Sequence, residues 1–172
     1  MTAFATLDPP PHTNLTPALK RAAYVELRAA TQATLDGETD RVVRQATLAC
    51  LIKTYLPYAY WAGFYDVDPG GDGLKVGPYQ GTLGCLRIAL GRGVCGRAAA
   101  EGATIVEEDV HALPLGADHI ACDPASRSEI VVPCFGADGE LFAVLDIDST
   151  ELASFDDIDR VELEALLAET FR

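Results

Sequence analysis

Cysteine is the residue type in this sequence with the clearest capacity for chemistry. The chain carries Cys50, Cys85, Cys95, Cys122 and Cys134. An odd number of widely spread cysteines is unlike the dense, even set that staples a small secreted domain, so reduced thiols are the expected default. None stands in a Cys-x-x-Cys pair, and the spacing matches no zinc finger or zinc ribbon. A structural metal is therefore not expected.

Cys122 lies in a segment, residues 107–127, that has no clear hydrophobic period and exceeds the usual length of a connection in a compact domain. We predict a functional loop there. A loop cysteine with no further context is most often a small, half-buried apolar residue. His111 and His119 share the loop and could ligate a metal with Cys122, although hydrogen bonds to the loop backbone are the commoner role.

The glycine-rich turn of residues 91–96 places Cys95 at the opening of a helix. Exposed amides and the helix dipole lower a thiol pKa at such a position and can bind a carboxylate, so Cys95 is either a relay thiol or a bystander. Arg92 and Arg97 flank Cys95 and could bind a substrate carboxylate or lower the thiol pKa. Arginines at such positions are more often solvated surface residues. Cys85 begins a predicted strand, where a packed core thiol and a functional thiol are equally compatible with the local sequence.

Cys50 falls on a predicted apolar helix face and Cys134 in an apolar strand, so we expect both to pack in the core. Asp146 and Asp148 alternate along one predicted strand and so share a face, and Glu129 lies on the preceding strand. The apolar neighbours of these carboxylates favour partial burial over a solvated strand end. Three like charges would repel one another unless a cation or a proton intervened. The spacing is not that of an EF-hand calcium loop.

The elements that must position these residues begin with two helices. Thr16 and Pro17 predict a helix start, and the apolar period runs on to about Gly37. A second helix is predicted over residues 38–56. The side chains expected to face inward are Leu19, Ala23, Leu27 and Ala30 on the first helix, and Val42, Val43, Ala46 and Cys50 on the second.

From residue 59 the period changes to two, which predicts a strand with Trp61 and Tyr65 on one face and Ala62 and Phe64 on the other. Further strands are predicted over residues 74–79, 85–90, 104–106, 130–135 and 141–147, a short helix over 97–100, and a closing helix over 155–171 with Ser154 as N-cap. Short connections favour antiparallel pairing. The fold class is therefore α+β.

Composition sets the broad limits. The length fits one domain, predicted over residues 15–172, after a proline-containing flexible arm over residues 1–14. The formal net charge of −13 repels phosphate backbones and anionic lipid, so no nucleic-acid or membrane partner is expected. No apolar run reaches membrane-spanning length and no secretory signal precedes the domain, which predicts a cytoplasmic protein.

Six stretches in one order resemble a known family. They are Trp61-Ala-Gly-Phe-Tyr65, Gly77-Pro-Tyr-Gln-Gly81, Gly91-Arg-Gly-Val-Cys-Gly96, His119-Ile-Ala-Cys-Asp123, Ser128-Glu-Ile-Val131 and Leu145-Asp-Ile-Asp-Ser149. From about Thr39 to the C-terminus, the chain is similar to the GAF-domain family of free methionine-R-sulfoxide reductases. Each stretch alone is weak evidence for the family, but six stretches in one order with three cysteines among them are specific to it.

The resemblance implies a six-stranded antiparallel GAF-like sheet flanked by helices, with a small closed pocket. It implies that Cys122 attacks the sulfoxide, that Cys85 resolves the sulfenic acid, and that Cys95 is a third family cysteine of uncertain role. Trp61 and Tyr65 would wall the pocket. The carboxylates Glu129, Asp146 and Asp148 would hold the substrate's ammonium group, and one of them, if protonated, would donate to the sulfoxide oxygen.

No nicotinamide or flavin fingerprint is present, because the glycine-rich turn heads no βαβ unit. We therefore expect no bound cofactor, and electrons from a thioredoxin system that draws on NADPH. Relatives also suggest a homodimer. The alternatives are a non-catalytic GAF module that binds a small ligand, and a thiol redox sensor whose cysteines oxidise without a specific substrate.

Overall fold

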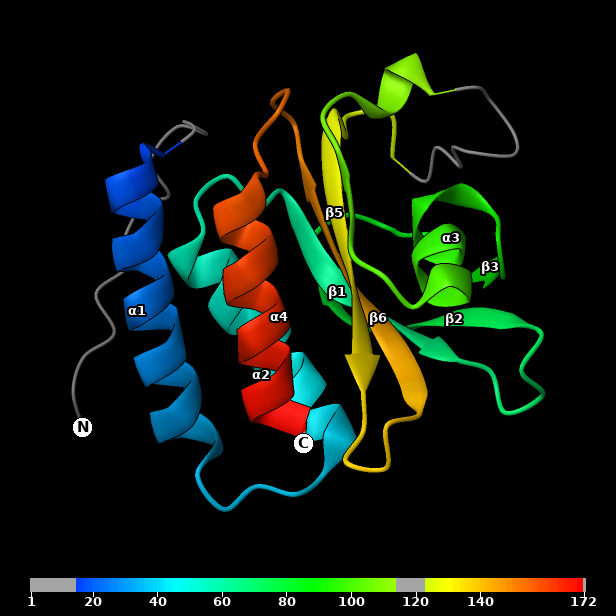
Figure 1. Cartoon of the computed structure of the whole chain (residues 1–172), viewed down its shortest axis with the longest axis horizontal. Coiled ribbons are helices and arrows are strands. Elements are labelled where there is room, and N and C mark those ends of the chain that lie inside the picture. Colours follow the sequence, from blue (N-terminus) through cyan, green and yellow to red (C-terminus); the bar gives the residue numbers. More distant parts are fainter. Residues whose placement is uncertain (1–14, 114–122, 172) are drawn as a thin grey trace.

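The structure is a computed structural model that describes residues 15–113 and 123–171. The predicted arm, residues 1–14, and the middle of the predicted functional loop lie outside this range. One six-stranded sheet in the order β3-β2-β1-β6-β5-β4 forms the centre, and all of its neighbouring strands pair antiparallel (Figure 1). The α+β prediction and the six-stranded antiparallel sheet are confirmed.

The strands are β1 (Trp61–Val67), β2 (Gly73–Gln80), β3 (Arg87–Ala89), β4 (Ile105–Glu107), β5 (Ser128–Phe135) and β6 (Leu141–Ser149). The helices are α1 (Pro17–Leu35), α2 (Arg41–Tyr55), α3 (Gly93–Glu101) and α4 (Asp157–Phe171), with a 3₁₀ turn, η1 (Val110–Ala112). Helices α1, α2 and α4 lie on one side of the sheet and α3 lies on the other (Figure 1).

The alternation predicted for β1 separates two cores. Ala62 and Phe64 are fully buried in the core under α1, α2 and α4, while Trp61 and Tyr65 belong to the smaller core under α3. Burying an aromatic or aliphatic side chain of this kind contributes roughly 1.5–3 kcal/mol. The sheet is therefore held from one side by the larger core, which leaves the α3 side free to build a pocket.

The predicted inward face of α1 is only partly correct: Leu27 is fully buried, and Ala23 and Ala30 are half-buried. The buried side chains are Lys20, Tyr24, Leu27 and Thr31, and Leu19 is 55% exposed. Lys20 is buried because its ammonium group pairs with Asp159 and lies 2.9 Å from Asp156, both at the start of α4. Because Lys20 is held inward by residues that are distant in sequence, most of the buried positions of α1 lie one residue later than predicted.

The predicted inward face of α2 is wrong. Its buried side chains are Gln45, Leu48, Ala49 and Ile52, whereas Val42, Val43, Ala46 and Cys50 are exposed. Gln45 donates to Asp66 of β1 at 2.7 Å, which is how an amide comes to face the sheet. Cys50 is thus an outer-surface thiol and not a core residue, while Cys134 is buried as predicted.

The closing helix begins later than predicted, and its cap differs. Asp156, not Ser154, accepts the amide of Ile158 at 2.8 Å, and Asp159 accepts the amide of Asp156 in return. This reciprocal arrangement resembles a capping box. Ser154 is instead buried and donates to Ser149 at 2.8 Å.

Candidate functional site

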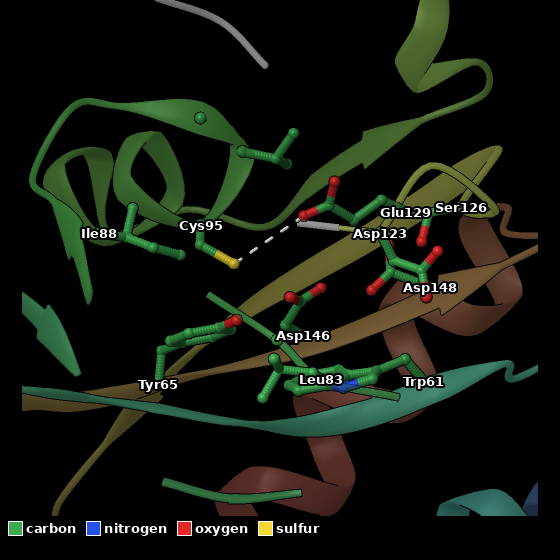
Figure 2. A pocket seen from close by; sticks show the side chains of 13 residues that line it. Trp61, Tyr65, Leu83, Ile88, Cys95, Asp123, Ser126, Glu129, Asp146 and Asp148 are labelled. Atoms are coloured by element: carbon green, nitrogen blue, oxygen red, sulfur yellow. Dashed lines mark hydrogen bonds between the residues drawn. The ribbon is translucent and has the colours of Figure 1, made fainter. Parts of the chain in front are cut away.

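A pocket opens between α3 and the face of the sheet that carries Trp61 and Tyr65 (Figure 2). Its empty volume is about 540 Å³, including the part open to solvent. Apolar and aromatic groups line one part and carboxylates the other, a combination typical of small-molecule sites. The lining residues are Trp61, Tyr65, Leu83, Gly84, Ile88, Gly93, Val94, Cys95, Asp123, Ser126, Glu129, Asp146 and Asp148.

Three carboxylates meet on the floor of this pocket. In the β5–β6 pairing, Glu129 is opposite Asp148 and Val131 is opposite Asp146. Side chains two apart on a strand share a face, so Glu129, Asp146 and Asp148 all point into the pocket (Figure 2). Glu129 is 8% exposed and Asp146 is 6% exposed. The predicted like-charge cluster therefore exists, and two of its members are buried.

The cluster holds more protons at neutral pH than ordinary carboxylates do. Burial raises the pKa of Glu129 well above the usual range, and the charges of Asp146 and Asp148 raise it further. Burial also raises the pKa of Asp146 well above the usual range, and the charge of Asp148 adds to this, against the lowering effect of hydrogen bonds with Cys95 and Glu129. Burial also raises the pKa of Asp148 to about 7, against the lowering effect of the Ser126 hydroxyl. A carboxyl group that keeps its proton near pH 7 can donate it to a ligand oxygen.

The cluster has no protein counter-charge within residues 15–113 and 123–171. None of the ion pairs in this part of the chain includes Glu129, Asp146 or Asp148. Asp146 Oδ1 is buried and accepts no hydrogen bond from a described residue. A buried acceptor without a donor costs about 1–3 kcal/mol, so the site is suited to a ligand that brings a cationic donor.

Cys95 lies next to this cluster, at the third residue of α3. Its Sγ is 3.9 Å from Glu129 Oε1 (Figure 2). The expectation of a lowered thiol pKa is wrong: burial raises the pKa of Cys95 well above its usual value, and Asp146 and Glu129 raise it further. Burial and the neighbouring carboxylates raise this pKa by more than the helix dipole lowers it. Cys95 is therefore a protonated thiol.

Cys95, Glu129 and Asp146 each offer a ligand atom, and these atoms all lie within 4.8 Å of one another. Among the described residues this is the only such group with the geometry to ligate a metal. An ammonium group needs the same anionic acceptors, and it also suits the protonated state of Cys95.

An aromatic wall closes the opposite side. Trp61 and Tyr65 are stacked, with ring centroids 5.8 Å apart, and Tyr79 of β2 stacks on Trp61 at 5.2 Å. Burial and the charge of Asp146 raise the pKa of Tyr65, which keeps its hydroxyl protonated. Gly84 makes room for the wall, because a Cβ there would lie 2.9 Å from the Tyr65 hydroxyl and 3.2 Å from Trp61. Neither Tyr79 nor Gly84 was among the predicted site residues.

The other predicted cysteines have different positions. Cys85 lies in the loop between β2 and β3, two residues before the predicted strand actually begins, and it is half-buried and disulfide-bonded. Cys50, Cys95 and Cys134 carry free thiols. Cys122 and His119 lie outside the described residues. Cys85 adjoins Leu83 and Gly84, which line the pocket.

Asp123, the residue after Cys122, was not predicted to act and yet lines the pocket. Its Oδ2 accepts hydrogen bonds from Thr82 Oγ1 at 2.6 Å and from the Tyr60 hydroxyl at 3.1 Å. The bond from Thr82 lowers the pKa of Asp123, and the amide of Ala125 assists. The position of Asp123 beside Cys122 in the His-Ile-Ala-Cys-Asp stretch was the available signal.

The predicted basic residues do not join the site. Arg97 pairs with Glu107 at 2.5 Å. Arg92 is exposed at the start of α3, and His111 lies in η1. Neither Arg92, Arg97 nor His111 lines the pocket.

Known proteins are similar to this chain in fold and in sequence. The GAF domain family model matches residues 32–170. A free methionine-R-sulfoxide reductase of Escherichia coli is 41% identical over 150 residues, covering 87% of each chain. The structure of free methionine-R-sulfoxide reductase from Neisseria meningitidis in complex with its substrate has a TM-score of 0.81 and 43% identity, covering 93% of this chain and 92% of that one. A putative GAF sensor protein of Burkholderia vietnamiensis has a TM-score of 0.79 and 47% identity, covering 87% and 91%.

Proposed function

The chain belongs to the GAF-domain family of free methionine-R-sulfoxide reductases, and we propose a thiol mechanism by which it reduces free L-methionine-R-sulfoxide to methionine. In this proposal the Cys122 thiolate attacks the sulfoxide sulfur. The oxygen leaves the substrate with one proton, giving methionine and a sulfenic acid on Cys122. The Cys85 thiol then attacks that sulfur, which releases water and leaves a disulfide.

The observation that carries the proposal is the buried carboxylate cluster, which has no counter-charge among residues 15–113 and 123–171 and faces an aromatic wall. A free amino acid brings the ammonium group that Glu129, Asp146 and Asp148 lack. A methionine-sulfoxide residue inside a peptide has no such ammonium group, so the cluster favours the free amino acid. Trp61 and Tyr65 would enclose the methyl sulfinyl end.

The raised pKa values supply the proton that the reaction needs. A protonated member of the cluster donates to the sulfoxide oxygen as the S–O bond breaks. A pKa of about 7 makes Asp148 one such donor, and the raised pKa of the more deeply buried Glu129 makes it another. In this proposal the remaining carboxylate charge binds the substrate ammonium.

Cys85 is the better candidate for the resolving cysteine. It is disulfide-bonded, whereas Cys95 carries a free thiol whose pKa burial raises. We assign Cys95 a different task, as a neutral thiol that donates to Glu129 and shapes the acid end of the pocket.

The disulfide must be reduced before the next turnover. We propose that thioredoxin supplies two electrons by dithiol exchange and is itself recycled with NADPH. A homodimer and a cytoplasmic location belong to the same proposal. Within the described ranges, no helix combines the length and the apolar character that crossing a membrane requires.

The test measures NADPH consumption with thioredoxin and thioredoxin reductase on three substrates. They are free L-methionine-R-sulfoxide, its S-epimer, and a peptide-bound R-sulfoxide. We expect consumption with the free R-epimer alone, abolished in Cys122→Ser. Folded, reduced wild type that turns over none of the three would contradict the proposal.

The alternative is a ligand-binding sensor, which the name of the Burkholderia vietnamiensis neighbour represents. Such a module needs neither Cys122 nor Cys85. It predicts that methionine or its sulfoxide binds wild type and Cys122→Ser equally, with no methionine formed by either.

A further inference from the structure

Two segments that each adjoin a redox cysteine are joined by hydrogen bonds at Asp123. Asp123 directly follows Cys122, and Thr82 precedes Cys85 by three residues. The Thr82 hydroxyl donates to Asp123 Oδ2 at 2.6 Å across 41 residues of sequence, and the Tyr60 hydroxyl donates to the same oxygen at 3.1 Å across 63. We call these three side chains the latch.

Each member of the latch is fixed to a separate part of the pocket. The Tyr60 amide donates to the Asp148 carbonyl at 2.7 Å, which anchors Tyr60 to β6. The Thr82 carbonyl accepts the Trp61 indole N–H at 3.0 Å, which anchors the β2–β3 loop to the aromatic wall. The Ala125 amide donates to Asp123 Oδ1 at 2.8 Å. The latch therefore joins the sheet, the Cys85 loop and the segment after Cys122.

The hydrogen bonds to Asp123 are of a kind that can hold two segments together. A lowered pKa keeps Asp123 ionised, so both hydroxyls donate to a full negative charge. Bonds to a charged acceptor are about twice as strong as neutral ones. Asp138, at another turn in this chain, accepts the amide two residues ahead. Asp123 does this and also bonds two distant segments.

We propose that Thr82 and Tyr60 are positioning residues that act through Asp123 to hold the segment after Cys122 against the Cys85 loop, and so accelerate disulfide formation. This rests on the proposed function, in which Cys122–S–OH and Cys85–SH condense to a disulfide and water. Resolution requires the two sulfurs to come into bonding contact, whereas attack on the sulfoxide involves Cys122 and substrate alone. The latch therefore acts on the second step.

The experiment separates the two steps in one turnover without reductant. Reduced enzyme is mixed with excess free L-methionine-R-sulfoxide, and quenched samples are assayed for methionine and for the Cys85 thiol. The Cys50→Ser background removes the exposed spectator thiol. Trp61 is the only tryptophan, so its fluorescence follows the pocket during the reaction.

Thr82→Val keeps the side-chain volume and removes the donor, and Tyr60→Phe does the same for the second bond. We expect each to slow disulfide formation roughly tenfold, with sulfenic acid accumulating on Cys122, while methionine appears within about twofold of the wild-type rate. Thr82→Ser retains a hydroxyl and should restore the wild-type rate of disulfide formation. Thermal unfolding of each variant confirms that it is folded.

Unchanged disulfide formation in folded Thr82→Val and Tyr60→Phe would overturn the proposal, as would an equal slowing of both steps. Hydrogen peroxide provides an independent route, because it oxidises the Cys122 thiolate to sulfenic acid and is itself reduced to water. If wild type forms no methionine, the proposed function fails, and the peroxide arm still tests the latch. Equal rates of Cys85 oxidation in wild type and Thr82→Val would then overturn the latch.

Discussion

Glu129 of β5 and Asp148 of β6 are direct cross-strand partners, so two carboxylates lie opposite each other beside the third, Asp146. Like charges in this arrangement destabilise a sheet. The fold tolerates them because burial and mutual repulsion raise their pKa values and keep protons in the cluster. The cluster therefore lowers the stability of the unliganded fold at the position where a cationic ligand would bind.

The pH dependence of stability follows from Asp148. Its folded pKa of about 7 exceeds an unfolded value of about 3.9. Between these values the folded state binds more protons than the unfolded state, so the stabilisation is complete below about pH 4 and is lost as pH rises through about 7. Asp148→Asn removes this loss. Relative to wild type, the variant should gain about 2–3 kcal/mol between pH 5 and pH 8, measured by urea unfolding without ligand.

The reference for that measurement is Asp138→Asn, at an exposed turn outside the pocket. It should differ from wild type by a similar amount at both pH values. A constant offset for Asp148→Asn between pH 5 and pH 8 would show that Asp148 titrates normally in the folded protein.

Removing one anionic partner should weaken the binding of the substrate ammonium. Asp146→Asn keeps the shape of the side chain and removes the carboxyl group whose buried Oδ1 accepts no hydrogen bond from a described residue. We expect KM for free L-methionine-R-sulfoxide to rise roughly tenfold to a hundredfold, as for loss of a charged hydrogen bond worth about 1.5–3 kcal/mol. Glu140→Gln, outside the pocket, is the control. A KM unchanged in Asp146→Asn would place the ammonium elsewhere.

The aromatic wall depends on the absence of a side chain at Gly84. A Cβ there would approach the Tyr65 hydroxyl to 2.9 Å and Trp61 to 3.2 Å. Gly84→Ala should therefore displace the rings, raise KM and change the fluorescence of Trp61. Gly70→Ala is the matched control, because the nearest atom to its added Cβ is 3.6 Å away. Wild-type KM and fluorescence in Gly84→Ala would show that the rings accommodate a side chain at this position without moving.

The Lys20–Asp159 pair stabilises the packing of α1 on α4. Both side chains are buried, and Tyr24 and Tyr58 also donate to Asp159. Lys20→Met leaves a buried carboxylate without its cation and should cost about 3–5 kcal/mol. Arg160→Met breaks an exposed pair with Asp157 and should leave the free energy of unfolding nearly unchanged. Chemical unfolding measures the free energy lost in each variant. Equal losses would mean that the buried pair stabilises the fold no more than the exposed pair does.

The parts of the fold set by local pattern could be predicted from the sequence. The two-residue period of β1 correctly separated Trp61 and Tyr65 from Ala62 and Phe64, and the same rule brought Asp146 and Asp148 to one face. Thr16 and Pro17 marked the start of α1. In each case the information lies within a few residues of the feature.

The errors arose where distant residues decide the outcome. Lys20 and Gln45 face inward because Asp159 and Asp66 accept their hydrogen bonds, and this turned Cys50 outward. The pKa of Cys95 was misjudged from its helix position, because its enclosure is built by β5 and β6. Periodicity within one helix contains none of this information.

The proposed mechanism requires a disulfide that the substrate itself creates. The most direct test treats fully reduced enzyme with one equivalent of free L-methionine-R-sulfoxide, then maps disulfide-linked peptides by mass spectrometry and counts methionine released. We predict one methionine per chain and a single new link between Cys122 and Cys85, with Cys95 still a free thiol. Methionine released together with a link that contains Cys95, or with no link at all, would contradict the account.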